Sequence, residues 1–351
     1  MTAFRLATSG DDDRLRRLLR DNSVPGWVEM SLEREPSYFA GQDWFGRDWA
    51  VLAEQGGDLV GMYAASVLPA CVNGAVEDVG YLGGLRVQAA HRQRIRHLRE
   101  GYASIRRLAP ALTSVPWWFT VVAADNDVAR RLLESGVSGL PRYRAIGNYT
   151  TFAMSAARGR SRAMWRGVRP DELPSVVAWH RQLATRQHLT PVLDEQRLTR
   201  IGTEGVWLCT EGDAYVGLAV MWNQGAFKQV VARRYRGALR WVRPAYNAYA
   251  HMARRVVLPA QGKALGHCFI AFLTLAPQAL ADRGTARDLL ADLLSKCPAP
   301  VATLGLHDEH PLRPTLDSFK PMRYAANVYA VEFDEPAHLD DRPVQPEAAL
   351  L

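Results

Sequence analysis

The 351-residue sequence has few of the features that mark secreted, membrane-spanning or zinc-stabilised proteins. Its most apolar run, Cys268 to Leu275, is far too short to cross a bilayer. Met1 to Arg20 carries three consecutive aspartates and several arginines, unlike a signal peptide. We therefore expect a cytoplasmic protein without a membrane partner. The cysteines are widely separated and form no CxxC pair, which predicts reduced core thiols and neither a disulfide framework nor a zinc site: Cys71, Cys209, Cys268 and Cys297.

Length and composition indicate a globular protein of two domains. Hydrophobic residues make up 48% of the sequence and charged residues 23%, which is ordinary for a chain that buries a full core. The net charge is +7, and the basic residues are overwhelmingly arginine. Arginine suits phosphate and carboxylate ligands. The charge alone would also permit nucleic acid.

The stretch from Val76 to Leu108 predicts a strand, a short turn and a long helix. Val79 to Val87 has β-branched and aromatic residues around Gly83-Gly84, typical of a buried strand with an irregularity. From Arg92 onward, apolar residues recur at spacings of three and four, and four arginines crowd the helix start. Because that end of a helix is already positive, these arginines indicate a bound anion such as a diphosphate. A solvated basic face is the alternative.

A second stretch, Phe119 to Val137, predicts an apolar strand, a helix that starts at Asp125-Asn126, and a glycine after it. A strand and basic helix followed by a strand, an asparagine and a second helix resembles the Gcn5-related acyl-CoA N-acyltransferase family. In that family the first helix start holds the pyrophosphate of coenzyme A, and the asparagine lies beside the pantetheine. The phosphate loop of the family carries two small residues where Ile95 and His97 stand here. Side-chain contacts from the extra arginines would replace the lost backbone contacts.

The resemblance implies acetyl-CoA as co-substrate, with no metal, and assigns site residues. The backbone of Leu85-Arg86-Val87 would polarise the thioester carbonyl. Tyr81 stands at the position of the family's base. Asp78 is a nearby carboxylate, which strand alternation places on the opposite face. The position of the leaving-group tyrosine is Leu133. The expected coenzyme contacts are Leu85, Arg86, Val87, Arg92, Gln93, Arg94, Ile95, Arg96, His97, Asn126 and Arg130.

The region from Asn22 to Asp48 is rich in tryptophan, proline and glycine, and in the resembling family it lies over the acceptor site. Trp27, Glu29, Glu33 and Tyr38 are therefore candidate substrate contacts, although packing or solvation explains each equally well. Elsewhere, Tyr246, Tyr249 and His251 lie among arginines. That mixture fits an RNA-binding surface or a solvated amphipathic helix.

The second half repeats the order of elements of the first. Pro141-Arg142-Tyr143 with Asn148 matches Pro321-Met322-Arg323-Tyr324 with Asn327. We expect an α/β (α+β) protein of two tandem N-acyltransferase-like modules, each a mixed, mostly antiparallel sheet flanked by helices. The predicted boundaries are 1–156 for an acetyl-CoA-binding module, 157–170 for a connector, 171–336 for a degenerate module without the arginine cluster, and 337–351 for a flexible tail.

The predicted activity is transfer of an acetyl group from acetyl-CoA to a primary amine of a small molecule or peptide. The alternative is a catalytically weak or inactive module that binds coenzyme A and acts as a sensor or assembly partner. We expect no nucleic-acid ligand, and the sequence leaves open whether the chain forms a homodimer.

Overall fold

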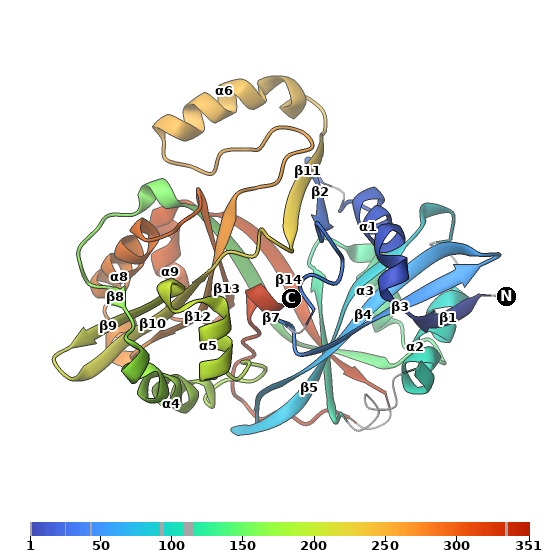
Figure 1. The fold of residues 1–351 in the computed structure, drawn as a ribbon, viewed down its shortest axis with the longest axis horizontal. Helices are drawn as coiled ribbons and strands as arrows, with labels where there is room; N and C mark the ends of the chain where they lie inside the picture. The colour runs from blue at the N-terminus through green and yellow to red at the C-terminus, as the bar shows by residue number, and fades with distance from the viewer. Residues whose placement is uncertain (1, 25, 43, 92–94, 109–114, 334–335) are drawn as a thin grey trace.

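The computed structural model describes residues 2–24, 26–42, 44–91, 95–108, 115–333 and 336–351 (Figure 1). Elements of the first half are β1 (Ala3–Leu6), α1 (Asp12–Asp21), β2 (Val28–Glu33), β3 (Arg47–Gln55), β4 (Asp58–Val72), β5 (Ala75–Val87), α2 (Ile95–Leu108), β6 (Trp117–Ala123), α3 (Asp127–Glu134) and β7 (Arg142–Ser155).

Elements of the second half are β8 (Arg166–Gly167), α4 (Leu173–Ala184), α5 (Glu195–Ile201), β9 (Val206–Glu211), β10 (Ala214–Trp222), β11 (Gln229–Tyr235), α6 (Leu239–Met252), β12 (His267–Leu275), α7 (Pro277–Ala281), α8 (Arg283–Ser295), β13 (Val301–His307), α9 (Arg313–Leu316) and β14 (Met322–Glu332).

The β4–β5 hairpin positions the predicted central strand. Its turn is Asn73-Gly74, with φ angles of 50° and 82°, the left-handed pair that two-residue hairpins require. Val67 and Leu82 are buried in this hairpin, and the partly buried Tyr63 packs against the same core cluster. The helix predicted after the strand is α2, whose Ile105 is buried in the same cluster. Strand, turn and helix therefore follow the sequence pattern.

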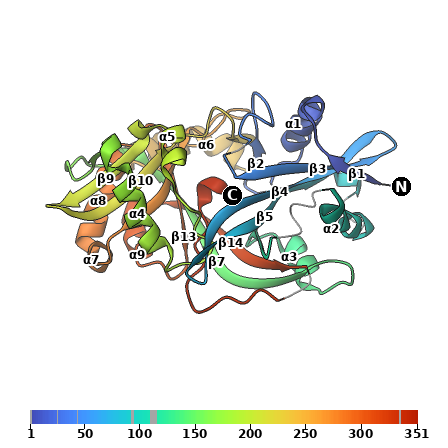
Figure 2. The same ribbon diagram turned by 60° about the horizontal axis from the view of Figure 1, so that its bottom comes forward.

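The predicted fold class is confirmed, but the two expected sheets are joined. Twelve strands form one sheet in the order β1-β3-β4-β5-β6-β14-β7-β13-β12-β10-β9-β8. It is antiparallel except for two pairs, β5 with β6 and β12 with β13. The two halves lie side by side in the same sheet, with helices on its faces (Figure 2).

The last strands of the halves are exchanged. β14 pairs with β6 of the first half, and β7 pairs with β13 of the second. β7 and β14 also pair with each other, with Asn148 opposite Asn327, and the two side chains share a hydrogen bond of 2.9 Å. The repeat detected in the sequence is therefore centred on this pair. Each half completes the sheet of the other, so the two predicted sheets are parts of one.

The expectation of a flexible tail at 337–351 is also wrong. Val344, Ala348, Ala349 and Leu350 are buried in the main core cluster. The segment is ordered despite its polar, proline-containing composition, because these few apolar side chains pack in the core. The connector is ordered as well, because the Asp292 carboxylate accepts hydrogen bonds from three of its backbone N–H groups. No helix among the described residues is long and apolar enough to cross a membrane.

Candidate functional site

The parallel strands β5 and β6 pair over only three residues each, Val79–Tyr81 with Trp117–Phe119. Beyond them each strand keeps only its antiparallel partner, β4 or β14. At the point of separation the Thr120 hydroxyl donates a hydrogen bond to the Leu82 carbonyl oxygen at 2.6 Å. We call this separation the first fork. From this point β5 and β6 no longer pair with each other, while both stay in the sheet.

A β-bulge follows the fork on β5. Ala64 is opposite Gly83 and Met62 is opposite Arg86, so Gly84 and Leu85 together face a single residue of β4. Gly84 has a φ of 61° and is exposed, and Leu85 is 47% exposed. The segment predicted to polarise a thioester therefore begins at an exposed bulge beside the fork.

The predicted pyrophosphate site lies mostly outside the described residues. Arg92, Gln93 and Arg94 are in the gap, and Ile95, Arg96 and His97 are described only as the backbone of the first turn of α2. A helix start therefore follows β5 as predicted. The coenzyme contacts of these six residues stay a prediction.

Asn126 and Arg130 have local structural roles. The Asn126 side chain caps α3 by accepting a hydrogen bond from the Ala129 N–H at 3.2 Å. The Arg130 guanidinium donates to the Ala124 carbonyl oxygen at 3.0 Å and pairs with Asp127 and Glu134 at 3.6 and 3.9 Å. These contacts fix the start of α3, and the predicted pantetheine contacts stay untested.

Tyr81 and Asp78 point to opposite faces of the sheet, since Tyr81 is opposite Ser66 and Asp78 is opposite Pro69 in the register. Asp78 is half-exposed and pairs with Arg47 at 2.7 Å. The Tyr81 ring packs on Phe119, with 5.0 Å between ring centroids. Burial raises the pKa of Tyr81 to about 12. Tyr81 therefore keeps its proton at neutral pH and can donate a hydrogen bond, but it is a weak base.

The four predicted substrate residues do not gather at the fork. Glu29 pairs with Arg236 at 2.5 Å, and Glu33 pairs with Arg233, both across the two-stranded sheet of β2 and β11. Tyr38 is buried, with Arg34 stacked 4.7 Å above its ring. Trp27 is 76% exposed at the far end of β2. Ion pairing and burial account for the first three without a substrate.

Two residues missed by the sequence analysis meet between the halves, Arg34 and Lys228. Lys228 lies 5.2 Å from the Phe45 ring centroid and 5.9 Å from that of Phe269, and its Nζ donates to the Leu351 carbonyl oxygen. Burial lowers the pKa of Lys228 to about 7, with a smaller contribution from Arg34. Arg34 also acts electrostatically on Tyr81. In the sequence, the only indication of this pair is that Lys228 is an isolated lysine in an apolar segment. Its burial could not be predicted, because it depends on residues distant in sequence.

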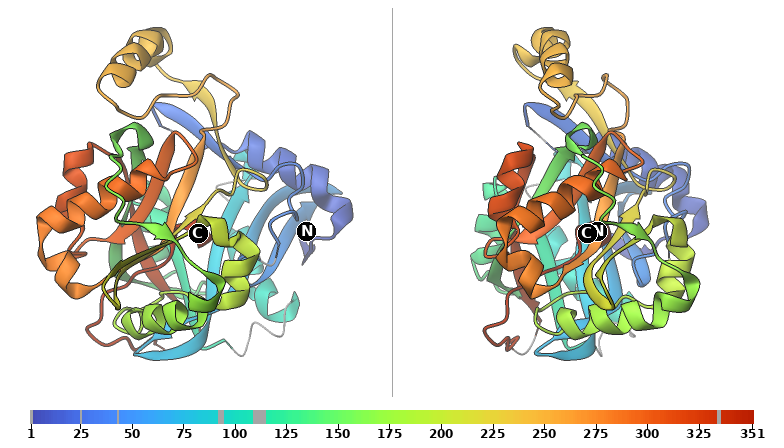
Figure 3. Two further views of the ribbon diagram at one scale, coloured as in Figure 1. Left: turned by 60° about the vertical axis from the view of Figure 1, so that its left-hand side comes forward. Right: turned by 90° about the vertical axis from the view of Figure 1, so that its left-hand side faces the viewer.

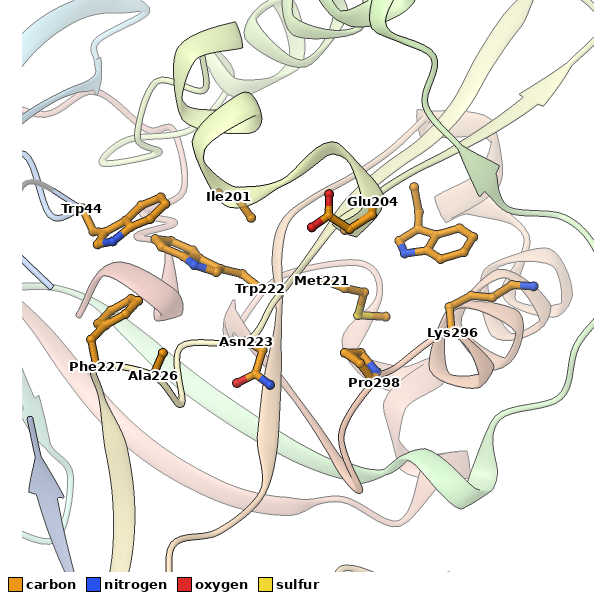
Figure 4. Close-up of a pocket in the computed structure, with 12 residues that line it drawn as sticks. Trp44, Ile201, Glu204, Met221, Trp222, Asn223, Ala226, Phe227, Lys296 and Pro298 are labelled. Atoms are coloured by element: carbon orange, nitrogen blue, oxygen red, sulfur yellow. The ribbon is translucent and has the colours of Figure 1, made fainter. Parts of the chain in front are cut away.

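A cavity of about 470 Å³ adjoins this region (Figure 4). Trp44, Trp222 and Phe227 form its aromatic end, and Trp44 stacks on Phe227 with 6.0 Å between ring centroids. Phe227 precedes Lys228 in the chain and contacts Phe45. Asn223, Glu204 and Lys296 supply its polar groups. The cavity therefore combines apolar walls, one of them from the first half, with a carboxylate.

The second half contains an equivalent fork. β12 and β13 pair in parallel over His267–Phe269 and Val301–Thr303 and then separate. A bulge follows three residues after the last paired residue of β12, as on β5, and places Phe272 at a φ of 51° where Gly84 stands in the first half. We call this separation the second fork. The two forks share their strand order and their bulge.

The C-terminal segment fills the second fork. The Phe272 N–H donates to Glu347 Oε2 at 2.7 Å, so a carboxylate occupies the bulge. On the opposite strand, Gln345 bonds the Gly305 carbonyl oxygen and the His307 N–H, each at 3.0 Å. Phe272 is only 3% exposed. The tail therefore bridges both strands of the second fork and covers its bulge.

Comparison with known proteins supports the fold. No protein-family model and no curated protein matches the sequence. The structure of Saccharomyces cerevisiae N-myristoyltransferase with bound myristoyl-CoA aligns over 97% of this chain and 87% of its own, with a TM-score of 0.60 and 12% identity. A GCN5-related N-acetyltransferase from Sphaerobacter thermophilus aligns over 96% of this chain and 98% of its own (TM-score 0.55, 13% identity).

A GCN5-related N-acetyltransferase from Anabaena variabilis ATCC 29413 aligns over 94% of this chain and 72% of its own (TM-score 0.52, 12% identity). At these low identities the similarity shows the fold alone. In each case it extends over nearly the whole chain. The resemblance predicted from the two strand–helix motifs is therefore confirmed at the level of structure. The chain has the fold of the Gcn5-related N-acyltransferases.

Proposed function

We propose that the protein is an N-acetyltransferase that moves an acetyl group from acetyl-CoA to a primary amine. The observation that carries this proposal is the first fork, where an exposed glycine bulge stands at the end of a short parallel pair and a helix start follows. The pantetheine would lie between β5 and β6, beyond their last paired residues. The thioester would lie against Leu85 to Val87, whose backbone N–H groups polarise its carbonyl.

Proton transfer is assigned to groups with different pKa values. Neutralising an amine of pKa 10.4 at pH 7 costs about 4.6 kcal/mol, so an acceptor for its proton is needed. With a pKa of about 7, Lys228 is partly neutral at that pH and can accept this proton directly or through water. Tyr81 stays protonated and donates a hydrogen bond to that water or to the departing thiolate.

We place the amine acceptor in the cavity between Trp44 and Lys296. Its aromatic end adjoins Lys228 through Phe227, and the Glu204 carboxylate can bind a second ammonium or amide group of the acceptor. Glu204→Gln should raise KM for the acceptor with little change in affinity for acetyl-CoA. A lower affinity for acetyl-CoA in that variant would contradict this placement.

Calorimetry with acetyl-CoA, followed by an acceptor screen that measures released thiol, tests the activity. The proposal predicts one acetyl-CoA per chain and thiol release that depends on an amine. Binding of acetyl-CoA without turnover of any amine at any pH would favour the alternative, a coenzyme A sensor or assembly module. The ordered tail in the second fork supports a structural role for that half in either case.

A further inference from the structure

Helix α6 and the strands that carry it form an arm that stands off the body (Figures 1 and 3). The arm has its own small core, in which Tyr235 and Leu258 are buried and Leu239 and Tyr246 pack against them. The Asn247 side chain exchanges two hydrogen bonds with the Leu258 backbone, at 2.9 and 3.0 Å. One face of α6 therefore packs on the rest of the arm, and the opposite face points outward.

The outward face of α6 is apolar. Trp241 is 72% exposed and Met252 is 86% exposed, and the exposed Ala245, Ala248 and Tyr249 fall on the same side of the helix at spacings of three and four. Trp27 lies beside the start of the helix, because its carbonyl oxygen accepts a hydrogen bond from the Arg236 N–H at 2.9 Å.

Exposed apolar side chains are concentrated on this arm. Five of the eleven large ones among the described residues belong to it: Trp27, Trp241, Val242, Tyr249 and Met252. We call these five, with Ala245 and Ala248, the outer stripe. A patch this concentrated marks an interaction surface rather than scattered surface residues.

The arm is also the most basic part of the chain. Residues 229–266 contain eight lysines and arginines and no acidic residue, so their formal charge of +8 exceeds the +7 of the whole chain. Glu29 and Glu33 of β2 pair with Arg236 and Arg233. Among the described residues, the following form no ion pair with a carboxylate: Arg240, Arg243, Arg254 and Arg255.

Positive charge peaks at the end of α6. Arg158 donates a hydrogen bond to the Ala253 carbonyl oxygen at 2.8 Å, and burial together with Arg255 and Arg254 lowers its pKa. Three like charges held together without a carboxylate repel one another, and an anionic partner would relieve that repulsion. At the other end of the helix, the Arg240 guanidinium lies 4.3 Å from the Trp241 ring centroid. Basic groups therefore flank the outer stripe on both sides.

We propose that the arm docks the protein on the surface of an anionic phospholipid bilayer. The outer stripe would enter the boundary between headgroups and acyl chains, with tryptophans at headgroup level, while the flanking arginines meet lipid phosphates. This docking needs no membrane-spanning helix, so the lack of a long apolar run in the sequence does not oppose it.

A bilayer explains the stripe better than nucleic acid does. Unpaired bases would stack on Trp27, Trp241 and Tyr249. Val242, Met252 and the two alanines offer a base neither stacking nor a hydrogen bond, whereas a bilayer buries all of them. A single projecting helix also presents a convex edge, which suits a broad, deformable surface.

Vesicle sedimentation tests the proposal with the full chain. We expect binding to phosphatidylcholine vesicles that contain phosphatidylserine, little binding to phosphatidylcholine alone, and release at high salt. Trp241→Ser with Met252→Ser should weaken binding at least tenfold. Arg254→Gln and Arg255→Gln should each weaken it about fivefold. The matched controls Val128→Ser and Arg287→Gln, on other surfaces, should bind like the parent protein.

Three results would overturn the proposal. The first is failure to bind any anionic vesicle. The second is tighter binding to single-stranded RNA than to these vesicles, with the same sensitivity to Trp241→Ser. The third is a dimer in sedimentation velocity that Trp241→Ser and Met252→Ser convert to monomer, because a second copy of the chain would then cover the stripe.

Discussion

The two forks of the sheet are built alike and are occupied differently. In both, a short parallel pair ends, and a residue with positive φ stands three positions later in a bulge. In the first fork that residue is the exposed Gly84. In the second it is the buried Phe272, whose N–H is bonded to Glu347. One backbone device thus serves two purposes: a candidate acyl site in the first half and an anchor for the C-terminal segment in the second.

This difference also explains why the second half keeps the bulge without the arginine cluster. A bulge leaves backbone polar groups that need partners, because a buried N–H without a hydrogen bond is costly. Glu347 supplies the partner of the Phe272 N–H in the bulge, and Gln345 bonds the facing strand β13. The second half therefore keeps the fork as a structural joint.

Exchanging the residues at the two bulges is the strongest way to break the comparison. Gly84→Phe gives the first fork the residue of the second. Phe272 has a similar positive φ, and a Cβ at Gly84 would lie 3.3 Å from the Ala64 Cβ. The ring would stand beside the fork and lower acetyl-CoA affinity by more than a hundredfold, in calorimetry. The reciprocal Phe272→Gly should leave that affinity unchanged. Equal affinity in Gly84→Phe and the parent protein would place the acyl site elsewhere.

Removing positive charge at the start of α2 should cause the next largest loss of acetyl-CoA affinity. Arg92→Ala with Arg94→Ala should weaken acetyl-CoA binding at least tenfold, since charge-assisted phosphate contacts contribute about 1.5–3 kcal/mol each. Arg107→Ala, exposed farther along the same helix, is the matched control. If the folded double variant and the control bind equally well, the pyrophosphate is not held at this helix start.

Lys228→Met tests the proton acceptor. We expect the rate at pH 7 to fall ten- to a hundredfold and the rise in rate with an apparent pKa of about 7 to disappear, because the neutral amine is lost. Binding of acetyl-CoA should be kept, and the exposed Lys263→Met should behave like the parent protein. An unchanged pH–rate profile in Lys228→Met would remove this lysine from the mechanism.

Tyr81→Phe should have a smaller effect, with a rate lowered up to about tenfold and no loss of affinity. The phenol, with its pKa of about 12, supplies one hydrogen bond and takes up no proton. Tyr249→Phe on the arm is a control for loss of a tyrosine hydroxyl. A thousandfold loss in Tyr81→Phe would instead make this phenol an essential acid.

Glu347→Gln should have the smallest effect on activity, but it should change how the free energy of unfolding depends on pH. Burial raises the pKa of Glu347 from its ordinary 4.5 to about 7, opposed by the N–H groups of Phe272 and Ala349 and by Arg197. The folded protein therefore binds this proton more tightly than the unfolded chain. The contribution of Glu347 to the free energy of unfolding should therefore fall as pH rises from about 4.5 to about 7, by roughly 2–3 kcal/mol.

In Glu347→Gln this fall should be absent when unfolding is followed by denaturant titration at several pH values. A fall of the same size in the variant would assign it to another group.

The local pattern of residues predicted the first fork well. Gly83-Gly84 within a β-branched strand indicated the bulge, and the 3.6-residue period after it indicated α2, because both depend on neighbours in sequence. The exchange of β7 and β14 could not be predicted. The matched Asn148 and Asn327 show that the halves are equivalent, but the same repeat would arise whether or not the strands change places.

The residues that were missed depend on distant contacts. Lys228 has a low pKa because Phe45 and Phe269 pack near it, and these lie far away in the chain. Glu347 is in a polar, proline-containing segment typical of a flexible end, and its role depends on a hydrogen bond from the Phe272 N–H, which is distant in sequence. Motif reasoning located Tyr81 correctly on β5, but its pKa depends on the packing of Phe119 and on nearby arginines.

A crystal structure of the protein with acetyl-CoA tests the central claim most directly. The account predicts one molecule per chain, with its thioester against Leu85 to Val87 and its phosphates at the start of α2, and with Glu347 still bonded to the Phe272 N–H. A coenzyme molecule in the second fork, with residues 345–351 displaced, would contradict it.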